Sequence, residues 1–339
     1  MKKHWICFLL AALLLAGCTT PAAAQPQRYT ATFLDVFNTV TTIVGFADSE
    51  TQFTQQAQAI HDELLRYHQL FDIYEDYEGI VNLKAVNKAA GGDAVQVDPE
   101  IIQLLADCKQ YNRLTGGKVN AAMGSVLQLW HKARSDAYDN PLNAYLPDQT
   151  QLEEGAKHAD FDHVILDEAN CTVRITDPLL QLDVGAIAKG WAAQKVAEQA
   201  PTGMLISVGG NVCATGPKPE DVPWVVGIEN PDGGDYLHTV YLRTGCVVTS
   251  GDYQRTFPVD GTFYHHIIDP LTLYPSEYFR SVTVICSDSG LADALSTALF
   301  VLPVEEGMAL AAQCGVEAMW LHRDGTRSYT PGFEKLIRT

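Results

Sequence analysis

Residues 265–300 read HHIIDPLTLYPSEYFRSVTVICSDSGLADALSTALF, and this stretch predicts the character of the fold. Its middle part, SVTVIC at 281–286, is a run of β-branched residues bounded by polar ones, which is typical of a buried strand. The part that follows, GLADALSTALF at 290–300, carries a leucine at every fourth position, which is typical of a helix. The stretch therefore predicts a buried strand that is followed at once by a helix.

The rest of the chain continues this mixture of strands and helices without a regular alternation. An amphipathic helix is predicted over 49–74, with Ser49 or Thr51 as its N-cap, and a second helix over 98–117 ends at Gly116 and Gly117. Because strands and helices do not alternate, the sequence predicts an α+β fold with mostly antiparallel or mixed sheets flanked by helices. The other predicted strands span 31–46, 163–167, 172–177, 179–185, 203–210, 223–230, 238–250 and 281–288, and the other helical segments span 186–200 and 290–313.

The first 18 residues predict an export signal. Two lysines precede an apolar run that is shorter than the roughly 20 residues needed to span a bilayer. The run ends in LAGC, which resembles the lipobox of bacterial lipoproteins, so we expect Cys18 to be the lipid-modified first residue of the mature chain. An ordinary secretory signal is the alternative, although its cleavage site is usually A-x-A-like. We expect residues 19–33 to be a flexible tether, residues 34–339 to form one two-lobed domain, and the protein to be anchored on the outer side of the cell membrane.

Composition excludes some classes of partner. The chain of 339 residues is 47% hydrophobic and 19% charged, which is typical of a globular protein. Its net charge of −18 argues against nucleic acid or anionic lipid as a partner, because both would be repelled. Six of its eight cysteines lie beyond the export signal, without C-x-x-C spacing. We interpret these six as core residues, and the sequence leaves a disulfide between two of them open.

Asp293 and Thr297 form a polar pair within the apolar helix at 290–300. Four residues apart on a helix, their side chains lie on one face. A carboxylate and a hydroxyl offer two hard oxygen ligands, which suit Mg²⁺ together with waters and substrate phosphate. The alternative is structural, because a threonine hydroxyl often bonds to the carbonyl four residues earlier in its helix.

Two further segments contain candidate site residues. LDVGAIAKGW, residues 182–191, predicts a strand, a glycine turn and a helix start, where backbone N–H groups and Lys189 could bind phosphate. A simple packing turn with a solvated lysine fits the same pattern. In YHHIIDP, His265 and His266 point to opposite faces of an extended segment, so we expect at most one of them to enter a given site.

The order and spacing of these segments resemble the ApbE family of FAD:protein FMN transferases from Phe37 almost to the C-terminus. Members of this family bind FAD with Mg²⁺, transfer its FMN half to a threonine hydroxyl of a partner protein, and release AMP. The resemblance also implies acceptors among the flavin-carrying subunits of membrane reductases of the Nqr or Rnf type. The residues that carry it are DVFNTVTTI, FDIYEDYEGIVNLKAVN, GGKVNAAMGSVLQLWHKAR, LDVGAIAKGWAAQKV, ISVGGNVCATG, PWVVGIENP, VVTSGDYQR and the opening stretch.

The resemblance assigns roles to particular residues. It implies that Asp293 and Thr297 bind Mg²⁺ with the backbone carbonyl of Ala186, and that His266 is a candidate general base for the acceptor threonine. It places the remaining residues around FAD: Phe37 beside the isoalloxazine, Lys189 near the flavin nucleotide, Ile268 in the pocket, and Val119, Asn120 and Ala121 in a further contacting segment.

The sequence departs from the family pattern at three positions and leaves other functions open. Asn120 replaces a common aspartate, Ala122 a common threonine, and Leu273 a usual glycine. One alternative function is an FAD hydrolase that yields FMN and AMP with water as the acceptor. Another is a non-catalytic flavin-binding or solute-binding lipoprotein, which would need neither the metal pair nor a base.

Overall fold

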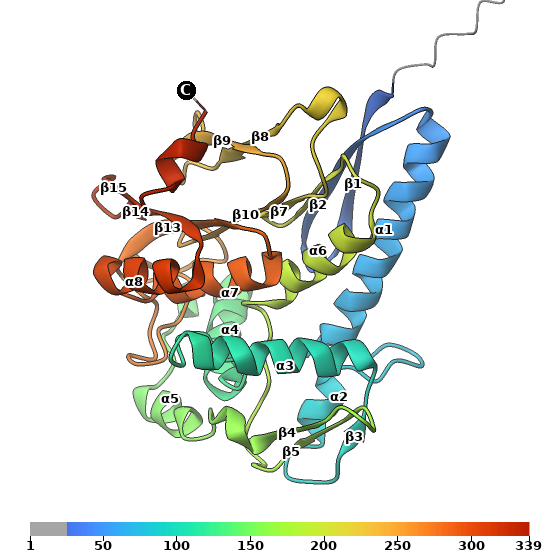
Figure 1. Ribbon diagram of the computed structural model, residues 1–339. Helices are drawn as coiled ribbons and strands as arrows, with labels where there is room; N and C mark the ends of the chain where they lie inside the picture. Colours follow the sequence, from blue (N-terminus) through green and yellow to red (C-terminus); the bar gives the residue numbers. More distant parts are fainter. Residues whose placement is uncertain (1–25, 339) are drawn as a thin grey trace, which may run out of the picture.

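The structure, a computed structural model, describes residues 26–338 and is built around one large antiparallel sheet (Figure 1). The predicted signal, Cys18 and residues 19–25 of the predicted tether lie outside the described residues. The sheet has eight strands in the order β1-β2-β6-β7-β10-β13-β14-β15, and every neighbouring pair is antiparallel. Its strands are β1 (Gln27–Val36), β2 (Thr39–Ala47), β6 (Leu205–Val208), β7 (Asn211–Ala214), β10 (Gly245–Gly251), β13 (Phe279–Cys286), β14 (Glu317–His322) and β15 (Arg327–Tyr329).

Both faces of this sheet are covered. Neighbouring residues of a strand point to opposite faces, so the inner strands contribute side chains to two hydrophobic clusters. In β10, Val248 belongs to the main core under the helices, whereas Val247 packs in a second cluster on the other face. The helices are α1 (Glu50–Phe71), α6 (Ala188–Gln199), α7 (Ser289–Phe300) and α8 (Val304–Cys314), and the second face is covered by the hairpin of β8 (Trp224–Ile228) and β9 (His238–Leu242).

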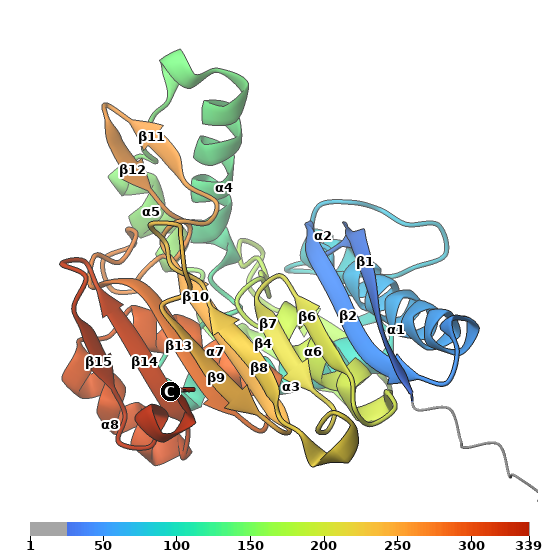
Figure 2. The same ribbon diagram turned by 90° about the horizontal axis from the view of Figure 1, so that it is seen from above.

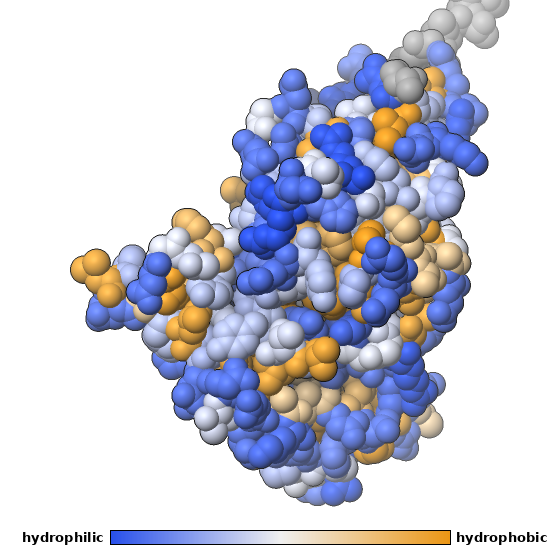
Figure 3. Space-filling model, turned by 90° about the vertical axis from the view of Figure 1, so that its left-hand side faces the viewer, coloured by the Kyte–Doolittle hydropathy of each residue, from blue (hydrophilic) through white to orange (hydrophobic). Residues whose placement is uncertain are grey.

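A second lobe packs against the helices on the side away from the sheet (Figure 1). One part of this lobe, an arm made of α4, α5, β11 and β12, projects from the body (Figure 2), and Figure 3 shows hydrophobic residues at its tip. The lobe contains α2 (Leu83–Lys88), α3 (Pro99–Leu114), α4 (Gly124–Asp139), α5 (Gln149–Ala156), β3 (Val95–Gln96), β4 (Val164–Asp167), β5 (Thr172–Ile175), β11 (Phe257–Val259) and β12 (Thr262–Tyr264).

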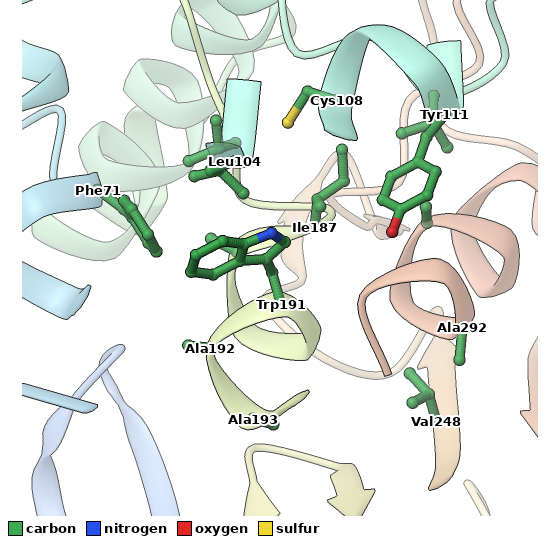
Figure 4. Packing of buried hydrophobic residues seen from close by; sticks show 14 of the residues in the cluster. Phe71, Leu104, Cys108, Tyr111, Ile187, Trp191, Ala192, Ala193, Val248 and Ala292 are labelled. Carbon is green, nitrogen blue, oxygen red and sulfur yellow. The ribbon is translucent and has the colours of Figure 1, made fainter. Parts of the chain in front are cut away.

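The two lobes share one hydrophobic core. Trp191 of α6 packs edge-on against Tyr67 and Phe71 of α1, with ring centroids 5.4 Å and 5.5 Å away. Figure 4 shows the same indole facing Leu104 of α3, so that one side chain connects elements of both lobes. The α+β class and the mainly antiparallel sheets predicted from the sequence are confirmed.

Local sequence explains where the predicted helices begin. The Ser49 side chain accepts a hydrogen bond from the backbone N–H of Gln52 (3.2 Å) and caps α1, as predicted. Asp288 caps α7 in the same way, by accepting from the N–H of Leu291 (2.8 Å). The helix that carries the polar pair therefore starts directly after strand β13.

Three sequence-based boundaries were wrong. Residues 179–185 are not a strand: only Gln181 forms a β-bridge, to Met123, and the N–H (2.7 Å) and carbonyl (2.9 Å) of the next residue, Leu182, bond to the side chain of Asn87. The helical segment 290–313 is two helices, α7 and α8, because it is broken at Pro303. Residues 27–33, placed in the tether, belong to β1, whose Tyr29 and Phe33 pack on the core.

No helix among residues 26–338 has the length and apolar character required to cross a membrane.

Candidate active site

One cavity of about 430 Å³ lies where the two lobes meet. It is enclosed by the β1–β2 turn, the end of α1, the starts of α4 and α6, α7 and the loop before residue 270. The structure thus brings all ten candidate site residues into one cavity: Phe37, Val119, Asn120, Ala121, Ala186, Lys189, His266, Ile268, Asp293 and Thr297.

Asp293 is held at the base of this cavity by the start of α6. The backbone N–H of Gly190 donates to Asp293 Oδ2 over 2.8 Å, and Lys189 Nζ lies 3.4 Å from the same oxygen. This approach requires glycine at position 190, because a Cβ there would lie 2.3 Å from the carbonyl oxygen of Ser289 and 2.4 Å from Asp293 Cβ. The glycine that the sequence placed in a helix start therefore lets α6 and α7 meet.

The environment of Asp293 suits a cation. The residue is 4% exposed, and burial raises the pKa of this carboxyl, while Lys189 acts in the opposite direction. Only Oδ2 accepts hydrogen bonds from the residues that the structure describes, which leaves Oδ1 available. Thr297 and the Ala186 backbone line the same cavity, so a carboxylate, a hydroxyl and a carbonyl can converge there. The described residues contain no cluster of three or more His, Cys, Asp or Glu that could hold a metal.

The polar end of strand β10, predicted as a turn, serves the structure beside this site. Ser250 bonds to Ser296 of α7, with 2.8 Å between the hydroxyl oxygens, and Thr249 bonds to Thr283 of β13 over 2.9 Å. Ser296 also donates to the backbone carbonyl of Asp293 (2.9 Å). Ser250 therefore fixes α7 against the end of β10 and so helps to fix Asp293.

His266 and His265 have different surroundings, as predicted. His265 is buried, and its Nε2 bonds to the carbonyl of Ser276 (2.8 Å), whereas His266 lines the cavity. His266 Nδ1 lies 3.1 Å from the carbonyl oxygen of Gln254, which can only accept, so Nδ1 carries the proton. Burial, followed by the nearby charge of Arg255, lowers the pKa of His266 well below its usual range. The ring is therefore neutral at pH 7 with an unprotonated Nε2, which is the state of a general base.

The sequence model of the ApbE family matches residues 36–320, which include every residue of this cavity. The chain belongs to the ApbE family. Among curated proteins it is 37% identical over 277 residues to the FAD:protein FMN transferase of Treponema pallidum, a match that covers 76% of this chain and 75% of that protein. It is 34% identical to the protein of the same name from Klebsiella pneumoniae, covering 75% of this chain and 80% of that one.

Solved structures of the family share the fold. The ApbE protein of Thermotoga maritima superposes with a TM-score of 0.82 at 31% identity, over 92% of this chain and 100% of that chain. The apo flavinyl transferase ApbE of Pseudomonas stutzeri superposes with a TM-score of 0.76 at 25% identity, over 92% and 98% of the two chains. Both matches cover nearly the whole of the described structure.

Two of the departures from the family pattern have a structural explanation. Asn120 donates from its amide to the carbonyl of Ala159 (2.7 Å) and accepts from the N–H of Ala122 (2.9 Å), so both ends of its side chain are engaged with backbone. Leu273 has a φ of +62°, a conformation that glycine adopts without strain. Its side chain is buried, and its carbonyl accepts from the indole N–H of Trp130 (2.9 Å).

The sequence analysis missed several polar residues of the cavity. Tyr74, His131, Asp183 and Arg255 line it; Tyr74 bonds to His131, whose Nε2 lies 3.8 Å from Asp183 Oδ2. Desolvation, followed by repulsion from Arg255, lowers the pKa of Arg134 beside this group. These residues come from four separate segments, and no local spacing connects them. All four lie in segments that carry the family resemblance, but the sequence analysis assigned none of them a role.

Proposed function

We propose that this chain is a Mg²⁺-dependent FAD:protein FMN transferase, which moves FMN from FAD to a threonine hydroxyl of a partner protein and releases AMP. The proposal is supported most by the buried carboxylate of Asp293, which has a free oxygen inside a cavity lined by candidate flavin contacts. A purely structural aspartate would be expected to have both oxygens satisfied at this depth. The names of the related proteins support the same activity.

Mg²⁺ would be held by the Asp293 carboxylate, the Thr297 hydroxyl and the backbone carbonyl of Ala186. This is a small set of hard oxygens, and Mg²⁺ usually completes such a set with waters and substrate phosphate. When bound, the ion would neutralise charge on the diphosphate of FAD. Lys189 lies beside the same carboxylate, 3.4 Å from Oδ2.

The rest of the cavity would hold the two chemically different parts of FAD. Phe37 and Ile268 offer apolar surface for the isoalloxazine ring, and Phe37 is held by its own N–H, which donates to His68 Nδ1 (3.3 Å). Lys189 and Arg255 bring positive charge to the cavity for the diphosphate. Phosphoryl transfer depends mainly on such positioning and charge neutralisation.

His266 would act on the acceptor. Its unprotonated Nε2 takes the proton of the threonine hydroxyl as the threonine oxygen bonds to the phosphorus of the FMN half. The bond between that phosphorus and the bridging oxygen breaks, and AMP leaves with this oxygen. The products are an FMN phosphoester on threonine and AMP, so no oxidant or reductant is needed.

The acceptors that we propose are flavin-carrying subunits of membrane reductases of the Nqr or Rnf type. An anchor at Cys18 would hold the enzyme at the outer face of the membrane, where such a threonine would be exposed. The family resemblance supports these acceptors, and the LAGC motif supports the anchor, since Cys18 lies outside the described residues.

The proposal is tested by measuring AMP after mixing the protein with FAD, with and without Mg²⁺ and with and without an acceptor fragment that bears the threonine. Release of AMP that requires both Mg²⁺ and the acceptor is the expected result. Release without the acceptor, together with free FMN, would indicate an FAD hydrolase. Intact FAD under all conditions would contradict the proposal and point to a flavin-binding protein.

A further inference from the structure

Three cysteines lie side by side on neighbouring strands of the large sheet. Cys246 of β10 is directly opposite Cys213 of β7 on one side and Cys286 of β13 on the other. Directly opposed residues of antiparallel strands project from the same face of a sheet. Their side chains therefore form a row at the edge of the main core, and all three are free thiols.

Cys246 and Cys286 have the geometry that a disulfide requires. Their sulfur atoms are 4.0 Å apart. Directly opposed residues of antiparallel strands have Cα atoms about 4.5–5.5 Å apart, and disulfides join Cα atoms separated by about 4.4–6.8 Å. The backbone is thus already within range, and rotation of the two side chains is sufficient to bring the sulfurs to bonding distance.

Accessibility distinguishes Cys286 from Cys213 as the partner of Cys246. Cys213 is 2% exposed, and burial raises the pKa of its thiol to about 12, which keeps it unreactive. Cys286 is partly exposed, and the hydrogen bond from the thiol of Cys246 lowers its pKa. Cys246 itself is fully buried, so an oxidant from solution reaches this pair through Cys286.

We propose that Cys246 and Cys286 form a cross-strand disulfide when the protein meets an external disulfide, and that Cys213 stays reduced. Cys286 loses its proton, and its thiolate attacks one sulfur of the external disulfide; the first external thiolate leaves and takes up that proton. The sulfur of Cys246 then attacks Cys286 and releases the second external thiol, which takes the Cys246 proton. The two protein thiols are oxidised and the external disulfide is reduced to two thiols.

This bond would act on the part of the fold that carries Asp293. Cys286 is the last residue of β13, and Asp288, two residues later, caps α7. Cys286 also donates its S–H to the carbonyl of Asp288 (3.1 Å), so its sulfur already contacts the turn into the helix. A disulfide would connect this turn covalently to β10. The inference does not depend on the proposed transferase activity.

The test is peptide mapping of the purified full-length protein after incubation with oxidised glutathione. Free thiols are blocked with iodoacetamide in denaturant before digestion, so that cross-linked peptides keep their native partners. We expect the peptides with Cys246 and Cys286 to be joined, with a mass lower by two hydrogen atoms, while Cys213 is alkylated. The oxidised protein should also unfold at a temperature several degrees higher than the reduced protein.

Two variants make the test specific. Cys246→Ser should abolish both the cross-link and the rise in unfolding temperature, whereas Cys171→Ser, at the distant turn between β4 and β5, should leave both unchanged. Alkylated Cys246 and Cys286 after oxidation would overturn the proposal. So would a linkage of Cys246 to Cys213, or of Cys286 to Cys314.

Discussion

Replacing Gly190 with alanine should separate α6 from α7 and disable the site. A Cβ at this position would lie 2.3 Å from the carbonyl oxygen of Ser289, whereas a carbon and an oxygen normally approach to about 3.3–3.6 Å, so the helices must move apart by roughly 1 Å. The hydrogen bond from Gly190 N to Asp293 Oδ2 would then lengthen from 2.8 Å to about 3.8 Å and be lost.

The expected cost of Gly190→Ala has two parts. Overpacking costs about 1–3 kcal/mol, and loss of a hydrogen bond to a charged group costs about 1.5–3 kcal/mol. A better helix propensity returns about 1 kcal/mol, so we expect a net loss of about 3 kcal/mol in the free energy of unfolding. The unfolding temperature should fall by roughly 5 °C in a chain of this size. Transfer activity should fall by about 10²-fold, because Asp293 is displaced by about 1 Å.

The matched control is Gly307→Ala in α8. There the nearest atom to a new Cβ, Trp320 Cζ2, is 3.2 Å away, so the neighbour needs to move by only a few tenths of an ångström. Chemical unfolding of both variants and of the parent, with AMP release measured on the same samples, provides the comparison. A Gly190→Ala protein as stable and as active as the parent would refute this explanation of the site.

Three further changes are informative. Asp293→Asn should abolish Mg²⁺-dependent AMP release without lowering the free energy of unfolding at neutral pH. Burial raises the pKa of Asp293 in the folded protein, so the stability that this carboxyl contributes below its unfolded pKa is lost as the pH rises through its folded pKa. The amide of asparagine stays neutral and avoids this loss. Full activity in this variant would remove the metal assignment. His266→Ala should slow transfer by about 10²–10⁴-fold. Because the pKa of His266 is lowered, the transfer rate of the parent should stay constant as the pH falls to well below the ordinary histidine pKa of about 6.5. A normal rate in the variant, or a parent rate that falls near a pH of about 6.5, would assign the base to another group. Asn120→Asp should lower the free energy of unfolding by about 1–3 kcal/mol, since a carboxylate cannot donate to the carbonyl of Ala159, and urea unfolding that matches the parent would contradict this.

The sequence predicted the elements whose signals are local. The Ser49 hydroxyl caps the first helix, and the residues after it repeat their apolar positions about every 3.6 residues. Both features can be recognised within a few consecutive residues of sequence. Residues 179–185 have an equally clear apolar pattern but do not form a strand. Their backbone bonds to the side chain of Asn87 and to the backbone of residues 121–124, which are distant in sequence, so the local pattern could not reveal these partners.

The sequence predicted individual residues of the candidate site but not the contacts between them. Asp293 and Thr297 were visible as a pair because helical spacing places them on one face, and the resemblance to a family extended this to the residues that line the cavity. The contact between Asp293 and Gly190 and the cluster around His131 could not be predicted. They depend on how α6 meets α7 and on how α4 meets the loop before α6, and this information resides in tertiary packing.

The central claim, that this protein attaches FMN to a threonine through a phosphoester, is tested most directly by mass spectrometry of the acceptor. A threonine-bearing acceptor fragment is incubated with the protein, FAD and Mg²⁺, and its threonine peptide is sequenced by fragmentation, with the Asp293→Asn variant as a parallel control. The account predicts a mass gain of one FMN less one water on the threonine with the parent protein and none with the variant. An unmodified threonine in the presence of the parent, while FAD is converted to free FMN and AMP, would contradict it.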